Sequence, residues 1–304
     1  MHQNQNKHTN NTHQPVLLQE VLQYLHPQKG DRYLDLTAGY GGHAAEVFNV
    51  TGKAKTSVLV DRDEHAISFL RERFSADAPQ LIHDDFYTAA QKLKQQQETF
   101  DCILADIGVS SPHLDKASRG FSLRADGPLD MRMDQRQELT AETIVNTYPE
   151  EDLYKIIRTY GEEPKARFIT RAIIANRPIN STIVLADIVK SAWRGKSKHH
   201  PASRTFQALR IAVNDELSLL QSSLPVWLEL LKPGGRIAVI SFHSLEDRIV
   251  KRAFSERGGD RYDADVRILT KQPVVATADE LVFNPRARSA KLRAAVKIKI
   301  NTKP

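Results

Sequence analysis

The stretch Tyr33-Leu-Asp-Leu-Thr-Ala-Gly-Tyr-Gly-Gly-His43 places a glycine-rich loop directly after a short apolar strand. A second apolar run, Thr56-Ser-Val-Leu-Val-Asp61, follows and ends on an acid. Glycines at a strand-to-helix turn let backbone N–H groups approach a ligand closely, and the helix behind them presents its N-terminus there. A carboxylate at the end of the second strand can accept hydrogen bonds from both hydroxyls of a ribose. The pattern predicts a nucleoside cofactor.

The loop alone does not say which nucleoside binds. The spacing Gly39-x-Gly41-x-x-Ala44 fits the dinucleotide fingerprint, but Asp35 lies inside the first strand, where it would repel a pyrophosphate. Three further landmarks follow in order: Asp84-Asp-Phe86, Phe100-Asp-Cys-Ile-Leu-Ala-Asp106 and Lys232-Pro-Gly-Gly-Arg-Ile-Ala-Val-Ile240. This succession resembles the class I S-adenosylmethionine-dependent methyltransferases. The resemblance implies an α/β, Rossmann-like sheet in which Phe86 flanks the adenine and Asp106 reaches the active site.

Composition bounds the remaining possibilities. The chain has 304 residues, of which 40% are hydrophobic, and no apolar run is long enough for a membrane span. Residues 1–14 are rich in Asn, Gln, His and Thr, which predicts a disordered tail rather than a signal peptide. A single cysteine, Cys102, excludes an internal disulfide and is typical of a reducing cytoplasm.

Basic residues are concentrated in two tracts. The net charge is +6, and the sequence pI is about 9.3. The tract from 188 to 214 contains no acid and carries Lys190, Arg194, Lys196, Lys198, Arg204 and Arg210. The chain after Glu280 is also free of acids and carries Arg286, Arg288, Lys291, Arg293, Lys297, Lys299 and Lys303. Two such tracts favour a phosphate backbone as partner.

The alternation of strand and helix that predicts a parallel sheet runs over residues 15–113. Residues 114–201 contain no strong strand, and amphipathic helices are expected at 150–160, 165–176 and 184–193. We therefore expect an inserted helical domain over 114–201 that recognises RNA, with the methyltransferase domain resuming over 202–304.

The resumed domain is expected to begin with a long helix over 202–220, which Pro225 interrupts or restarts. Ser244 and Asp247 are expected to cap the helix after the 236–240 strand. A last strand over 294–300 is expected to bury one face only, because Lys297 and Lys299 alternate with apolar residues.

Several longer motifs resemble one family, the bacterial ribosomal RNA small subunit methyltransferase H (RsmH/MraW) family. The matching strings are His13-Gln-Pro-Val-Leu-Leu-Gln-Glu20, Gly41-Gly-His43, Asp106-Ile-Gly-Val-Ser-Ser-Pro112, Arg119-Gly-Phe-Ser122, Asp126-Gly-Pro-Leu-Asp-Met-Arg-Met-Asp134, Tyr160-Gly-Glu-Glu163, the run from His200 to Glu216, the run from Ile240 to Lys251, and Asn284-Pro-Arg-Ala-Arg-Ser289. This chain departs from the family at His113, where Gln is usual, and at Ala44, where Ser is common.

The resemblance implies S-adenosylmethionine as cofactor and N(4) of a cytidine in the decoding region of 16S rRNA as methyl acceptor. It places the cofactor against Gly41, Gly42, His43, Asp61, Phe86, Asp106 and His113. The partner is then 16S rRNA or the small ribosomal subunit. Free rRNA and an assembled subunit both remain open as substrates, as does the oligomeric state.

Asp106 is the candidate catalytic residue. The exocyclic amine of cytosine is a weak nucleophile because its lone pair is delocalised, so a hydrogen-bond acceptor that also takes the departing proton is needed. The end of the fourth strand is where such an acceptor belongs, and the Ser241-Phe-His-Ser244 turn is expected to face the same crevice.

Three alternatives are weaker. Methylation at ring carbon 5 would need Cys102 as nucleophile, although it lies in an apolar strand. A dehydrogenase is disfavoured because the chain has no evident Tyr-x-x-x-Lys pair. A non-catalytic RNA-binding protein is disfavoured because it would not need an intact cofactor loop. A metal site at His199, His200 and His243 lacks supporting ligand spacing, so no metal is expected.

Overall fold

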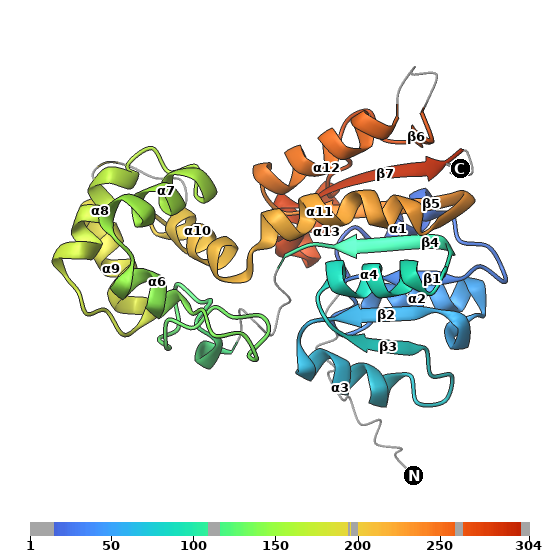
Figure 1. Ribbon diagram of the computed structural model, residues 1–304, viewed down its shortest axis with the longest axis horizontal. Coiled ribbons are helices and arrows are strands. Elements are labelled where there is room, and N and C mark those ends of the chain that lie inside the picture. The colour runs from blue at the N-terminus through green and yellow to red at the C-terminus, as the bar shows by residue number, and fades with distance from the viewer. Residues whose placement is uncertain (1–14, 109–115, 194, 196–199, 259–263, 299–304) are drawn as a thin grey trace, which may run out of the picture.

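The computed structural model describes residues 15–108, 116–193, 195, 200–258 and 264–298. The described chain forms two lobes, one built on a sheet and one of helices, which lie side by side in Figure 1. The expected tail at 1–14 and the site residue His113 lie outside the described residues. No helix in the described part of the chain is long and apolar enough to cross a membrane.

The sheet lobe is built on a seven-stranded sheet with the order β3-β2-β1-β4-β5-β7-β6. Its strands are β1 (Tyr33–Asp35), β2 (Val58–Asp61), β3 (Gln80–His83), β4 (Phe100–Asp106), β5 (Leu231–Ser241), β6 (Val266–Ile268) and β7 (Lys291–Lys297). The pairings from β3 to β5 are parallel, and β7 is antiparallel to both of its neighbours. The expected Rossmann-like α/β sheet is confirmed, and β6 is a strand that the sequence pattern did not reveal.

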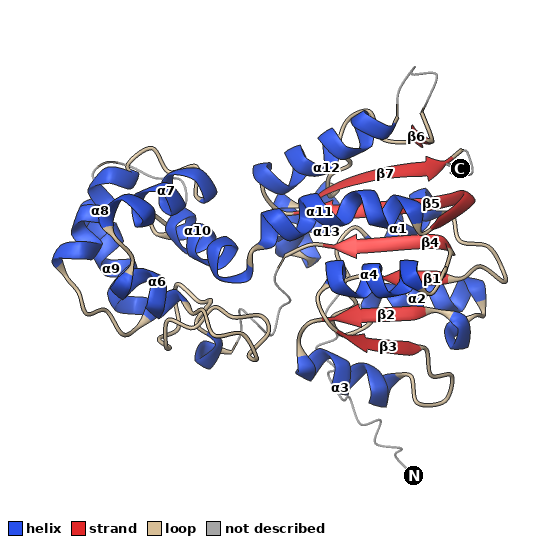
Figure 2. Cartoon of the chain, viewed as in Figure 1, coloured by secondary structure: helices blue, strands red, loops and turns tan. Residues whose placement is uncertain are grey.

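Helices cover both faces of this sheet (Figure 2). The helices of the sheet lobe are α1 (Leu18–Leu25), α2 (Gly42–Thr51), α3 (Glu64–Arg73), α4 (Phe86–Gln95), α11 (Glu216–Glu229), α12 (Ser244–Arg257) and α13 (Ala278–Phe283). Alternate residues of each strand enter opposite cores, so that Leu34 packs with α4, α11 and α12. Its neighbour Tyr33 packs with α1, α2 and α3 on the other face.

The helical lobe has its own apolar core. It contains α6 (Ala141–Thr147), α7 (Glu150–Tyr160), α8 (Ala166–Ala175), α9 (Thr182–Ala192) and α10 (Ser203–Asn214). The last of these helices packs against α6 and α7, and its Phe206 and Leu209 are buried in this core. The inserted unit therefore extends to Asn214, past the boundary expected at 201.

The expected long helix is two helices. Asp215 has φ of +47° and ends α10, and α11 begins at Glu216. Pro225 lies inside α11 without ending it. The break predicted at Pro225 was therefore wrong: the chain turns between the lobes at Asp215.

The expected one-sided burial of the last strand was also wrong. β7 lies between β5 and β6 in the sheet and contacts α1 and α12, and its residues from Leu292 to Lys297 are all buried. Its two buried cations are each paired with a carboxylate: Arg293 Nε lies 2.6 Å from Asp247, and Lys297 Nζ lies 3.1 Å from Asp265. The lysine therefore faces a buried partner instead of solvent.

Candidate active site

Three carboxylates gather at one edge of the sheet. Asp35 ends β1, Asp61 ends β2 and Asp106 ends β4, and these strands are parallel neighbours. Because parallel strands end at the same edge, the three side chains lie at one edge of the sheet, where ligands bind in such folds. An edge lined by acids can bind ribose hydroxyls and a cationic group, whereas it would repel a pyrophosphate.

The Asp61 carboxylate holds the glycine loop to the end of β2. Its Oδ2 atom accepts a hydrogen bond of 2.8 Å from the Gly39 N–H, and its Oδ1 atom accepts one of 2.8 Å from the Asp63 N–H. Gly39 has φ of +51°, a conformation that favours glycine. The acid and the loop that were predicted to bind one ligand are therefore in direct contact.

Gly41 and Gly42 allow this loop to pack closely against the rest of the lobe. Gly41 has φ of +73°, and a Cβ atom there would lie 2.7 Å from the ring of Phe74 on α3. A Cβ atom on Gly42 would lie 2.7 Å from Cγ of Pro15. A side chain at either position would require Phe74 or Pro15 to shift, and at Gly41 it would also strain the backbone.

His43 connects the loop to Asp106. It lies in the first turn of α2 and is buried, and its Nε2 atom is 2.9 Å from the backbone oxygen of Val16. Its Nδ1 atom is 3.9 Å from Oδ2 of Asp106. The Asp106 N–H donates a hydrogen bond of 2.6 Å to Oγ1 of Thr37. The Thr37 hydroxyl thus fixes the end of β4, and His43 lies near its carboxylate.

Asp106 carries an unused acceptor. Its Oδ1 atom is buried and has no hydrogen-bond partner among the described residues. Burial, followed by the nearby carboxyl groups of Asp35 and Glu246, raises the pKa of Asp106 to about 8. Burial also raises the pKa of Asp35 to about 7, although the hydroxyl of Tyr33 donates to it. A cationic group bound at this edge would favour the ionised form of both acids.

Phe86 occupies the start of α4, just after β3. The Asp85 side chain caps this helix by accepting from the N–H groups of Tyr87 and Thr88. The Phe86 ring is partly buried and meets the ring of Trp227 edge-on, with 5.4 Å between centroids. This places an aromatic side chain beside the strand that carries Asp61, where an adenine would lie in the expected arrangement.

The turn after β5 lies against the loop after β4. Gly108 has φ of +118°, and a Cβ atom there would come within 3.3 Å of the Phe242 ring. His243 caps α12 and forms a capping box with Glu246. The predicted cap by Ser244 and Asp247 was therefore wrong by one position. The Glu246 Oε2 atom also accepts from the N–H of Phe242 at 2.7 Å, which fixes the turn.

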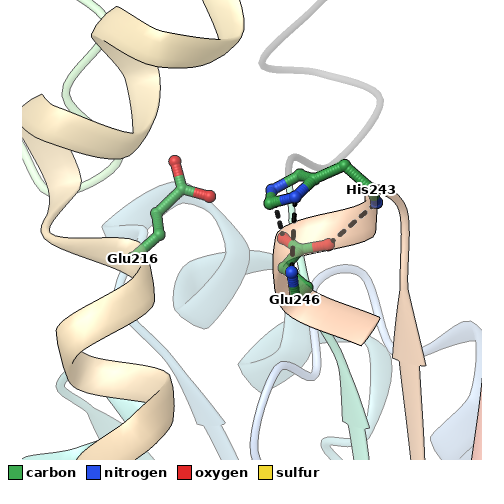
Figure 3. A group of neighbouring side chains, drawn as sticks. All are labelled: Glu216, His243 and Glu246. Carbon is green, nitrogen blue, oxygen red and sulfur yellow. Dashed lines mark hydrogen bonds and ion pairs between the residues drawn. The ribbon is translucent and has the colours of Figure 1, made fainter. Parts of the chain in front are cut away.

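Glu216, His243 and Glu246 form a buried polar cluster that the sequence analysis did not identify. Figure 3 shows Glu216 reaching from α11 towards the turn that carries the other two. Arg210 makes a two-pronged ion pair with Glu216, at 2.8 and 2.9 Å, and lies 3.9 Å from Glu246. The guanidinium group of Arg210 already pairs with these carboxylates, so the cluster is an ion-pair network. Arg210 is therefore not available for the RNA contact that was expected of its basic tract.

Ion pairs also join the two lobes around the crevice. Glu162, in the loop before α8, accepts a hydrogen bond from Ser244 and pairs with Arg248 of α12. On the other side, the buried Arg119 pairs with Asp63 at 3.1 Å. The helical lobe is therefore held at the same edge of the sheet that carries Asp106.

Cys102 cannot serve as a nucleophile. It is buried in β4, and burial raises the pKa of its thiol to about 12. A thiol of that pKa supplies almost no thiolate at neutral pH. The ring-carbon alternative is therefore disfavoured by the structure.

Comparison with known proteins identifies the family. The sequence profile of the MraW methylase family matches residues 10–298. The chain belongs to the MraW methylase family. The Ribosomal RNA small subunit methyltransferase H of Nitratidesulfovibrio vulgaris is 49% identical over 310 residues, covering 94% of this chain and 95% of that protein. The protein of the same name from Halothermothrix orenii is 44% identical over 306 residues, covering 94% and 98%.

A solved structure described as an rRNA methylase from Streptococcus thermophilus aligns over 93% of this chain and 94% of that one, with a TM-score of 0.41 and 11% identity. As an MraW methylase, the protein is an S-adenosylmethionine-dependent methyltransferase, and the resemblance read from its motifs is confirmed. The acid-lined edge and the orphaned Asp106 oxygen fit a cofactor that carries a ribose and a positive sulfonium.

The individual cofactor contacts of this MraW methylase stay predictions. If Asp61 binds the ribose, Asp61→Ala should weaken S-adenosylmethionine binding by about 1.5–3 kcal/mol, the range for a charge-assisted hydrogen bond. Calorimetric titration measures this. Glu98→Ala, which removes a surface acid paired with Arg32, is the control and should leave affinity unchanged. Unchanged affinity in a folded Asp61→Ala protein would remove Asp61 from the site.

Proposed function

We propose that this methyltransferase transfers the methyl group of S-adenosylmethionine to N(4) of a cytidine in the decoding region of 16S rRNA. The observation that carries the proposal is the buried, unpartnered Oδ1 atom of Asp106 at the end of β4. S-adenosylmethionine, when bound, supplies a methyl group already activated by its sulfonium. The protein must then position an amine and accept its proton.

We assign that task to Asp106. A carboxylate oxygen that accepts a hydrogen bond from the amine localises the lone pair of the nitrogen and receives the proton released on methylation. A pKa of about 8 for Asp106 lies close to physiological pH, which suits such an acceptor. Alignment of the amine with the methyl group and the sulfur can supply roughly 7–11 kcal/mol of the barrier, so fixed strand ends matter as much as the acid.

The cofactor contacts follow the same edge. We propose that Gly41, Gly42 and His43 hold the methionine side, Asp61 the ribose and Phe86 the adenine. Support comes from their placement around the ends of β1, β2 and β3 and from the bond between Asp61 and the glycine loop. The expected contribution of His113 falls outside the described residues.

The helical lobe is the proposed RNA-recognition unit. A target base must leave its helical stack to reach a buried methyl donor, so protein surfaces on both sides of the crevice should hold the flanking nucleotides. Ion pairs of Glu162 and Arg119 hold this lobe against the edge of the sheet at which Asp106 lies. Arg204 is exposed on α10, whereas Lys196 and Lys198 of the same basic tract lie outside the described residues. We propose that the protein acts in the cytoplasm, on free rRNA or on the small subunit.

Modified-nucleotide mapping of 16S rRNA tests this function. Cells lacking the protein should lose methylation at N(4) of one decoding-region cytidine, and the wild-type protein should restore it. Restoration by Asp106→Asn would contradict the assigned chemistry, and an unchanged modification pattern in the deletion strain would contradict the substrate. Incubating purified protein separately with naked 16S rRNA and with small subunits decides between these two substrates.

A further inference from the structure

The end of α13 displays two large apolar side chains to solvent. Phe283 is 78% exposed and Val282 is 73% exposed, which makes them the most exposed large apolar residues of the described chain. The same short helix is anchored elsewhere, because Leu281 packs against the core that contains α1 and α2. The exposed pair therefore lies on a fixed element of the sheet lobe.

Positive charge lies directly beside these residues. The 3-10 turn Pro285–Ser289 follows α13 and buries Asn284 and Ala287 while exposing Arg286 and Arg288. Arg288 makes no ion pair with any residue that the structure describes. Arg293 and Lys297, further along the same acid-free tract, are buried in ion pairs. Among the described residues of this tract, the exposed arginines are thus concentrated next to Phe283.

This patch lies close to the cofactor edge of the sheet. The Leu17 N–H donates a hydrogen bond of 2.8 Å to Oε1 of Glu280 in α13. The preceding residue, Val16, contacts His43 through its backbone oxygen, and His43 lies 3.9 Å from Asp106. A short chain of contacts therefore connects α13 to the proposed acceptor. In Figure 1, α13 lies at the ends of the strands that face the helical lobe.

We propose that Val282, Phe283 and Arg288 form a stacking platform for an unpaired nucleotide of the rRNA strand that enters the active site. The proposal rests on the function proposed above. An exposed aromatic ring offers a face to any base, and adjacent guanidinium groups can stack on bases or bind the flanking phosphates. Such a platform would hold the strand while the neighbouring cytidine leaves its stack.

A second exposed phenylalanine provides a matched control. Phe168 on α8 is 66% exposed and also has arginines beside it. Those arginines are neutralised by acids of α7, because Arg167 lies 3.0 Å from Glu151 and Arg171 lies 3.5 Å from Glu150. Because the arginines beside it are paired with acids, Phe168 should contribute little to RNA binding.

Fluorescence anisotropy with a labelled single-stranded RNA containing the decoding-region cytidine tests the platform. Phe283→Ala should weaken binding roughly 5- to 100-fold, the range for losing one base–aromatic stack, while Phe283→Trp should retain it. Arg288→Gln should lower the slope of log affinity against log salt by about 1. Phe168→Ala should bind as the wild type does. S-adenosylmethionine affinity, measured by calorimetry, should be unchanged in all four variants.

Wild-type RNA affinity in Phe283→Ala would overturn the platform. A change in sedimentation of Phe283→Ala without a change in RNA affinity would instead assign the patch to a protein contact, and would also overturn it. These outcomes are distinct from failure of the proposed function. If the wild-type protein methylates no 16S rRNA cytidine, the function fails, yet the effect of Phe283→Ala on RNA affinity is still measured.

Discussion

Replacing Asp106 with asparagine should lower the single-turnover rate of methyl transfer by roughly 100-fold or more, as expected for loss of a general base. Asparagine keeps the shape of the side chain and one oxygen, but it cannot take a proton from the amine. The Oδ1 atom of Asp106 is buried without a partner among the described residues, so none of these residues competes for it. RNA affinity should change little.

The measurement is a single-turnover assay at saturating S-adenosylmethionine, which separates cofactor binding from chemistry. Recovery of the wild-type rate at saturation would mean that Asp106 is only a cofactor ligand. Asp84→Asn is a useful control. This acid follows β3 and not β4, and its Oδ2 atom lies 2.7 Å from Nζ of Lys92. Its rate at saturation should match that of the wild type.

The pH profile gives a second test of the same residue. Burial, Asp35 and Glu246 raise the pKa of Asp106 to about 8, so in the ligand-free protein its carboxyl group is mostly neutral below that pH. Only the ionised form can accept the proton, so the rate should rise with pH in this range. The positive charge of the bound sulfonium favours ionisation and should move the midpoint below 8. In Asp106→Asn this ascending limb should be absent.

The parts of the fold that sequence patterns predicted correctly are local. The order of strands and helices up to Asp106 follows from apolar runs separated by glycines and acids, and each predicted strand end is found at the same edge. Helix α7 begins and ends where its periodicity predicts, at Glu150 and Tyr160. These features depend on neighbours in sequence, which is why periodicity suffices to find them.

Apart from the cap of α12, which was misplaced by one position, the errors in the fold concern partners that are distant in sequence. Lys297 alternates with apolar residues and so predicts a solvent-facing side chain, but β6 and Asp265 cover it. Pro225 indicates a helix end, whereas the chain turns at Asp215, where α10 leaves one core and α11 enters another. No local pattern tells which core a helix joins.

The polar cluster beside the active site shows the same limit. Arg210 belongs to an acid-free tract and was predicted to contact RNA, yet it pairs with Glu216 and lies close to Glu246 of another helix. The short spacing from Arg210 to Glu216 was available in the sequence as a signal. The sequence did not reveal that a single residue in the left-handed conformation separates α10 from α11.

Replacing Asp265 with alanine should lower the free energy of unfolding by about 3–5 kcal/mol, the loss expected when one member of a buried ion pair is removed. Lys297 is only 3% exposed, and its Nζ atom lies 3.1 Å from Asp265 and 3.0 Å from the backbone oxygen of Leu228. Without the carboxylate, the ammonium group stays buried with one neutral acceptor. Urea denaturation measures the change. Asp77→Ala, which removes a largely exposed partner of Lys55, should cost about 0–1 kcal/mol.

The pH dependence and a double variant identify the cause. Burial opposes ionisation of Asp265, but hydrogen bonds from Arg257 and Lys297 outweigh it and hold the pKa of the carboxyl group below its usual range. A lowered pKa means that the stabilisation is fully present above the unfolded value of about 3.9. It is lost as the pH falls through the lower folded value, so wild type and Asp265→Ala should converge in stability under acid conditions.

Adding Lys297→Met removes the stranded charge and should recover most of the loss, because an apolar side chain of similar volume suits this buried position in β7. If the double variant is no more stable than Asp265→Ala, the loss comes from the pairing of Asp265 with Arg257 and not from Lys297.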